Sequence, residues 1–287
     1  MDQQIKGNHF VLQDDAQQHL SIIKKNIIMK KLAFMFIALV AILSVSACRI
    51  EKVDNSNQPR KSYVLNLRDF QSIKNYTSCD IHFTQSNTYK VVLKATPRWY
   101  DTHSITSSHG ELVITQKEER KQKGTTVLHI NTYEDDAELW ISAPSLDAVT
   151  TAGSGDFHAE SDLTGQHLTL STAGSGDSDL KNVTLSGNFT YSVAGSGDIE
   201  TGTLQASNAS FSISGSGDIK SKLAKVKTTK LSIAGSGDGS LDFDHCGHAD
   251  ISISGSGDID LSGTLQSLEK NVSGSGDIDT EKLKLGK

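Results

Sequence analysis

The chain has 287 residues, with 28 Lys and Arg against 34 Asp and Glu, so its formal net charge is −6. Glycine occurs 24 times, proline only 3 times, and aromatic residues make up 6%, a composition typical of β-rich proteins with regular tight turns. The length allows one large or two ordinary domains, and the lack of a basic excess argues against a nucleic-acid partner.

Residues 29–47 have the pattern of a bacterial lipoprotein signal peptide. Lys30 and Lys31 form a positive start, residues 32–43 are an unbroken apolar run, and small residues precede Cys48. The pattern predicts that the signal is removed and that Cys48 is acylated. The protein would then be exported and anchored by lipid to the bacterial outer membrane, on its periplasmic or cell-surface side. The alternative is an uncleaved membrane helix, for which the run is short against a hydrocarbon core of ~30 Å.

The segments on either side of the signal have separate interpretations. Met29 is the expected start, so residues 1–28 are interpreted as an over-extended start or a disordered extension. Residues 48–61 are polar and lack apolar periodicity, and they predict a tether between the lipid and the domain. Two further cysteines, Cys79 and Cys246, are expected to be small buried side chains, with one disulfide as the alternative.

The tetrapeptide Gly-Ser-Gly-Asp occurs seven times in the second half of the chain, at spacings of 21, 21, 20, 20, 20 and 19 residues. Ala or Ser always precedes it, and self-similarity at such a period indicates stacked copies of one structural unit. The first glycine and the aspartate of each copy are Gly153 and Asp156, Gly174 and Asp177, Gly195 and Asp198, Gly215 and Asp218, Gly235 and Asp238, Gly255 and Asp258, and Gly274 and Asp277.

Between these turns apolar and polar residues alternate. In residues 208–214, for example, Ala209, Phe211 and Ile213 fall on one face. A period of two predicts half-buried β-strands, and no window predicts an amphipathic helix of useful length.

Residues 195–214 illustrate how one repeat divides. A turn is followed by a short strand, a bend at Gly202, a second strand, a bend at Asn208 and a third strand. Three short strands in twenty residues predict one rung, or turn, of an all-β parallel solenoid whose rungs pair ~4.8 Å apart. A propeller blade would need about twice this period, and the consensus of a leucine-rich repeat is missing.

The Gly-Ser-Gly-Asp motif is interpreted as the recurring corner of this solenoid. Both glycines would allow positive φ values, and the aspartate carboxylate would accept hydrogen bonds from nearby backbone N–H groups. Stacked carboxylates ~5 Å apart also repel by around 1 kcal/mol in water, so calcium binding along the aspartate column is an alternative. No metal or other cofactor is predicted.

Residues 62–150 carry strand patterns without a clean repeat, and we expect less regular rungs or a β-layer with wider loops that caps the stack. With the repeat rungs at 151–283, they form one domain over residues 62–283.

Two local features are candidate binding residues. Trp99 and Tyr100 stand beside a proline in a predicted loop and are possible ligand contacts, whereas Trp140 lies in an alternating strand and is expected in the core. His245, Cys246 and His248 could bind zinc or copper, but their compact spacing favours a bend with chance histidines.

The order of motifs also resembles a known family. DFQSI (69–73), CDIHFTQSNTYKVVLKA (79–95), GELVITQ (110–116) and LWISAPSLDAVTTAGSGD (139–156) lead into the repeated tetrapeptide. This order is similar to the putative auto-transporter adhesin, head GIN domain family of bacterial envelope proteins, over about residues 62–283. The resemblance implies a right-handed, single-stranded β-helix and suggests adhesion, but it implies no catalytic or ligand-binding residues.

The sequence therefore predicts a non-catalytic envelope lipoprotein, adhesin-like or structural, whose solenoid face binds a glycan or a protein. One alternative is a polysaccharide-active β-helix enzyme, for which Asp258 with Asp260 and Asp277 with Asp279 are paired acids. A periplasmic structural or stress-related lipoprotein is another. The oligomeric state is left open.

Overall fold

The structure is a computed structural model that describes residues 48–49, 58–117, 126–127 and 137–286. The chain divides into two compact units. In the unit formed by residues 1–54 and 119–133, the described strands are β1 (Cys48–Arg49) and β8 (Thr126–Val127), which pair in parallel. The predicted signal peptide lies outside the described residues, as does most of the tether.

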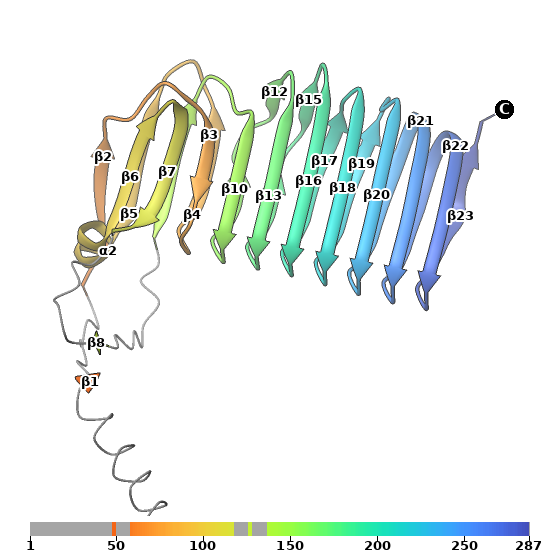
Figure 1. Cartoon of the computed structure of the whole chain (residues 1–287). Helices are drawn as coiled ribbons and strands as arrows, with labels where there is room; N and C mark the ends of the chain where they lie inside the picture. Colours follow the sequence, from red (N-terminus) through yellow and green to blue (C-terminus); the bar gives the residue numbers. More distant parts are fainter. Residues whose placement is uncertain (1–47, 50–57, 118–125, 128–136, 287) are drawn as a thin grey trace, which may run out of the picture. The chain divides into compact units, whose positions relative to one another are not determined.

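The other unit, residues 55–118 and 134–287, contains a parallel β-solenoid of about seven turns with ~20 residues per rung. Its repeat rungs stand side by side in Figure 1, from green to blue. The first glycines of the seven repeats pair with one another in series, from Gly153 to Gly274. The predicted all-β solenoid and its period are therefore confirmed.

The strands merge as the stack proceeds. Two rungs have three short strands each, namely β11 (Phe157–Ala159), β12 (Leu163–Gly165) and β13 (Leu168–Gly174), then β14 (Ser178–Leu180), β15 (Val183–Leu185) and β16 (Asn188–Gly195). The next rungs are β17 (Ile199–Gln205) with β18 (Asn208–Gly215), and β19 (Ile219–Ala224) with β20 (Thr228–Gly235). The stack ends with β21 (Gly239–Gly255), β22 (Ile259–Gly274) and β23 (Ile278–Leu285).

The predicted bend at Gly202 does not divide this part of the rung into two strands. β17 runs through it, and the bend appears only as a register shift between Thr201 and Thr203 in the pairing with β19. A bulge bends a strand while leaving the flanking ladder intact, so a bend does not have to end a strand.

The first half of this unit joins the stack through β3 (Phe70–Asn75) and β4 (Asp80–Gln85). These strands pair in parallel with β10 (Ala148–Gly153) and β11. On their other edges lie β7 (Gly110–Gln116) and β9 (Glu138–Ala143), also parallel. Antiparallel pairs complete the end: β2 (Lys61–Leu65) with β5 (Lys90–Ala95), β5 with β9, and β6 (His103–Ser108) with β7. This end of the unit therefore combines parallel strands that continue the stack with antiparallel pairs.

One short helix interrupts this half, α2 (Pro97–Thr102). The Thr96 side chain accepts a hydrogen bond from the Trp99 backbone N–H at 3.2 Å, and proline occupies the first helical turn, where its missing N–H costs nothing. The expectation of a loop at this place is wrong because these capping signals outweigh the short length.

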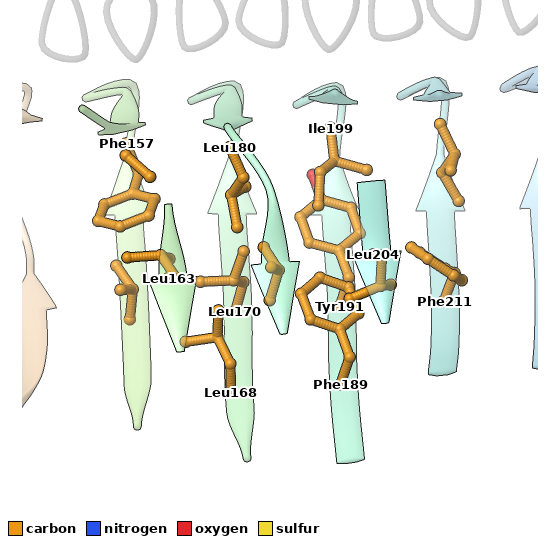
Figure 2. Packing of buried hydrophobic residues seen from close by; sticks show 14 of the residues in the cluster. Phe157, Leu163, Leu168, Leu170, Leu180, Phe189, Tyr191, Ile199, Leu204 and Phe211 are labelled. Atoms are coloured by element: carbon orange, nitrogen blue, oxygen red, sulfur yellow. The ribbon is translucent and has the colours of Figure 1, made fainter. Parts of the chain in front are cut away.

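The core is one continuous cluster of inward-facing side chains along the stack. Figure 2 shows part of this cluster, in which labelled side chains such as Phe157, Leu180, Phe189 and Phe211 point from the strands into the interior of the stack. Burying each such side chain stabilises the fold by roughly 1.5–3 kcal/mol. Cys79 and Cys246 are buried and free, so the alternative of a disulfide between them is wrong.

Candidate binding face

The aspartates of the repeated tetrapeptide form a ladder. The backbone N–H of each aspartate donates to the carboxylate Oδ1 of the aspartate one rung earlier, at 2.7–2.9 Å from Asp177 to Asp277. The carboxylates thus accept hydrogen bonds from backbone N–H groups as expected, and the donors belong to the next rung. Six backbone N–H dipoles therefore offset part of the repulsion between the stacked carboxylates.

The ladder begins one rung earlier than the repeat. Asp156 donates its N–H to the Asp80 carboxylate at 3.0 Å, so Asp80 is the first member. The tripeptide Cys79-Asp80-Ile81 matches the Gly-Asp-Ile of later rungs in its last two residues. This match is the sequence signal for Asp80, which the full tetrapeptide does not include.

The two glycines of each corner have different roles, contrary to the expectation that both adopt positive φ. Only the first does, as in Gly215 with a φ of 148°. For the second, such as Gly217, the constraint is contact, because a Cβ would overlap the carbonyl oxygen of Gly197 in the preceding rung. Both positions exclude side chains, one by conformation and contact and the other by contact alone.

In each rung, the residue two positions after the ladder aspartate points outward, and these residues form a second column. At the first rungs this column continues into a row of four side chains, Lys94, Trp140, His82 and His158, called here the Trp–His row. Asp179 pairs with His158, His158 with His82, and His82 with Trp140 across neighbouring strands. The Trp140 and His82 rings stack 4.0 Å apart, and the His158 ring lies 5.0 Å beyond. The Lys94 Nζ lies 4.2 Å from the Trp140 ring centroid, within cation–π range.

Carboxylates hold this row in place. Glu138 accepts hydrogen bonds from Trp140 Nε1 at 3.0 Å and Lys94 Nζ at 3.2 Å, and it pairs with Arg60 at 2.8 Å. The bond from Trp140, with the two cations, holds the pKa of Glu138 below its ordinary value. The Trp–His row is therefore a preorganised feature of the face.

On the repeat rungs the face becomes an acidic groove with a volume of about 620 Å³. One side is formed by ladder aspartates and the other by the second column. The residues along it include Asp177, Asp198, Asp218, Asp238 and Asp258 on the first side, and Asp179, Glu200, Lys220, Ser240 and Asp260 on the second. Burial raises the pKa of Asp198, opposed by the N–H of Asp218.

The two tryptophans have exchanged their expected places. Trp99 is only 2% exposed and stacks on His103, so its predicted contact with a ligand is wrong. Tyr100 is 41% exposed but stacks face to face on Tyr63. Trp140, expected in the core, is half-buried on the outer face. Alternate residues of a strand point to opposite faces, and the buried Leu139 and Ile141 occupy the inward positions on either side of Trp140. The sequence therefore contained the signal that Trp140 points outward.

The segment with His245, Cys246 and His248 lies within β21 at a bulge. Cys246 is buried and its thiol donates to the Leu223 carbonyl, while His245 pairs with Asp244 at 2.6 Å. Over the described ranges, no group of three or more His, Cys, Asp or Glu side chains could hold a metal ion. No helix in the same ranges is long and apolar enough to cross a membrane.

Solved structures with similar folds come from Bacteroides and Parabacteroides species. An adhesin-like protein from Bacteroides fragilis, named a putative adhesin, superposes with a TM-score of 0.64 at 21% identity, covering 77% of this chain and 97% of that one. A putative lipid binding protein from Parabacteroides distasonis gives 0.58 at 24% identity, covering 80% and 98%. A putative adhesin from Parabacteroides merdae gives 0.57 at 18% identity, covering 81% and 99%. At these identities the likeness shows the fold.

Among curated proteins none matches the chain. A family model does, over residues 69–241 and again over 219–287, which together span most of the chain and include the corner ladder. The chain therefore belongs to the family described as putative auto-transporter adhesin, head GIN domain.

Proposed function

We propose that the protein is a non-catalytic binding module of the bacterial cell envelope, anchored through a lipid on Cys48. Its outer face, from the Trp–His row to the acidic groove, binds an extended ligand, a glycan or a protein segment. Family membership supports an adhesin-like role, and a rigid solenoid is suited to presenting a long surface.

The observation that carries this proposal is the register of the second column. Each of its members is aligned with its neighbour by parallel pairing, from Trp140 through His82, His158 and Asp179 onward. An extended ligand with a regular repeat would meet one outward side chain every ~4.8 Å, first aromatic and imidazole rings and then mainly carboxylates. Little side-chain freedom would be lost on binding, because Glu138 and the stacking contacts already hold the row.

A polysaccharide-active enzyme is the second candidate, and the acidic groove is the observation that favours it. Asp258 and Asp260 both line the groove and belong to its two sides. Asp258, however, already accepts the backbone N–H of Asp277, which ties its carboxylate to the corner.

Surface exposure on cells is the first test. Intact cells producing the wild type, or Cys48→Ala, would be treated with protease and probed with an antibody to the repeat rungs. We expect the wild type to be cleaved on intact cells and the variant to leave the membrane fraction. Protection of the wild type until the outer membrane is opened would overturn an adhesive role.

Ligand binding is tested on a panel of glycans and envelope proteins. Lys94→Ala and Trp140→Ala are expected to weaken binding at least 10-fold, whereas Lys230→Ala, an exposed lysine on β20 outside this column, should bind as the wild type does. Equal binding by all three variants would show that the Trp–His row does not contact the ligand. Release of reducing ends from the same glycans, abolished in Asp260→Asn, would favour the enzyme instead.

A further inference from the structure

The two histidines of the row are direct neighbours on adjacent strands. His82 in β4 and His158 in β11 occupy paired register positions, and their ring centroids lie 5.0 Å apart with an angle of 25° between the planes. Both side chains reach solvent, with exposed fractions of 17% and 29%. Histidines juxtaposed in this way are the elements of a metal site, because imidazole nitrogen is a ligand for zinc, copper and nickel.

Each ring has one nitrogen committed to a carboxylate. His82 Nδ1 lies 2.7 Å from Glu160 Oε1, and His158 Nδ1 lies 3.1 Å from Asp179 Oδ2. An ionised carboxylate only accepts hydrogen bonds, so Nδ1 carries the proton, and the lone pair of the neutral ring is on Nε2. Within the described part of the chain, neither Nε2 has a hydrogen-bond partner.

A carboxylate bonded to the second ring nitrogen is the arrangement that orients metal-ligating histidines and raises their basicity. Here it occurs twice on neighbouring rings, and both carboxylates add negative charge near the pair. Asp80 and Asp156 lie on the same two rungs, each two residues before a histidine of the pair, and the Asp156 N–H donates to the Asp80 carboxylate at 3.0 Å, so further negative charge lies nearby. Lys94, the nearby cation of the row, is on the far side of Trp140 from the pair.

We propose that His82 and His158 form a two-nitrogen binding site for a borderline divalent transition metal such as Cu²⁺, Ni²⁺ or Zn²⁺. Glu160 and Asp179 are its positioning residues, and water completes the coordination sphere. Nitrogen–metal distances of about 2.0–2.1 Å require the two Nε2 atoms to approach within about 4 Å. His82 is held by stacking on Trp140, so the more exposed His158 is the ring that closes.

The proposal implies selectivity. Ca²⁺ and Mg²⁺ prefer oxygen ligands and gain nothing from two imidazoles, so they should not compete. With only two protein ligands the site exchanges its metal readily and leaves coordination positions open. The site shares His82 and His158 with the Trp–His row, so the proposed ligand binding is measured with a chelator present, which keeps the two activities distinguishable.

Calorimetric titration of the full chain with Cu²⁺ and with Zn²⁺ tests the site. We expect the wild type to bind one equivalent more than His82→Gln/His158→Gln, and no heat from Ca²⁺ at this site. The matched control is His245→Gln/His248→Gln, which removes two histidines of β21 and should retain the extra equivalent. Identical stoichiometry and affinity for the wild type and the first double variant would overturn the proposal.

Electron paramagnetic resonance of the Cu²⁺ form separates ligands from positioning residues. His158→Gln should reduce the coupling from two nitrogens to one. Glu160→Gln should keep two nitrogens while weakening binding 10–100-fold, the range seen when such supporting carboxylates are removed. A Glu160→Gln variant with unchanged affinity would show that the carboxylate does not orient the ring. Thermal unfolding with chelator present confirms that each variant is folded.

Discussion

At the scale of single residues, the corner glycines illustrate how neighbouring rungs restrict sequence. Gly215 has a φ of 148°, and a Cβ there would overlap the carbonyl oxygen of Gly195 in the rung before. The restriction comes from backbone conformation and from a contact with a residue twenty positions away. Neither could be relieved by moving a flexible side chain, because the obstructing atom belongs to the backbone.

We therefore expect Gly215→Ala to lower the free energy of unfolding by about 3 kcal/mol, since strain from the positive φ adds to the overlap. Urea denaturation of the purified protein measures this change. Gly165→Ala is the matched control, because its Cβ would lie an ordinary 3.6 Å from Leu185 Cδ2. A similar small effect for both variants would contradict the corner geometry.

The ladder carboxylates make stability depend on pH in an unusual direction. Burial raises the pKa of Asp156 and of Asp198 above the ordinary value of 3.8, and the backbone N–H from the next rung opposes this only in part. The folded state thus holds these protons more tightly than the unfolded state does. Their contribution to stability is fully present below pH 3.8 and is lost as the pH rises through the raised pKa.

The double variant Asp156→Asn/Asp198→Asn tests this sign. Asparagine keeps an oxygen that can accept the N–H of the next rung, but it cannot titrate. Urea denaturation at pH 4 and pH 7 should show that the wild type loses more stability on going to pH 7 than the variant does. Parallel pH profiles would mean that these two carboxyl groups are not perturbed by folding.

At the scale of elements, one rung is the unit of the stack. β18 pairs residue by residue with β16 before it and β20 after it, so the two neighbours present equivalent edges. Stability in such arrays is a sum of repeat and interface contributions. The consequence is that whole rungs are interchangeable, whereas fractions of a rung are not, because a fraction would rotate every later inward residue out of the core.

Deleting residues 199–218 should therefore give a folded protein with one rung fewer and a lower melting temperature. Circular dichroism should retain its β-sheet spectrum and a cooperative thermal transition. The control deletes residues 199–208 alone, which leaves a corner without its rung and is expected to destroy the transition for the later rungs. If both deletions behave alike, the rung is not the cooperative unit.

At the scale of the molecule, one column of stacked apolar core residues ends in a charged residue near the C-terminal end of the stack. Phe211, Leu231 and Ile251 follow one another in register, and the next position is Lys270. Its Nζ donates to the Ile278 carbonyl at 3.3 Å. Among the described residues, no strand pairs with the outer edge of β22 beyond Leu265. A lysine on an edge strand opposes pairing with another chain.

Lys270→Ile should accordingly promote end-to-end association, because it restores the apolar column at an edge with free backbone groups. Light scattering after size-exclusion chromatography would show larger species that grow with protein concentration. Lys230→Ile adds the same side chain to β20, whose two edges are paired, and should leave the distribution unchanged. Larger species in both variants would mean that any added exposed isoleucine causes non-specific association, whether or not it lies on the free edge of β22.

The sequence by itself determined the solenoid. Every rung turns at the same corner, so the residues that form that corner, Gly-Ser-Gly-Asp, recur in the sequence once per rung. Period two then assigned inward and outward residues along the repeat strands. Trp140 was expected in the core and instead lies outward between the buried Leu139 and Ile141. Tertiary structure alone decided the rest. The burial of the Trp99 side chain in helix α2 had no periodic pattern to announce it, and the antiparallel end has no repeat to reveal it. The Trp–His row joins residues 82, 140 and 158, whose contact depends on strand pairing between segments far apart in the chain.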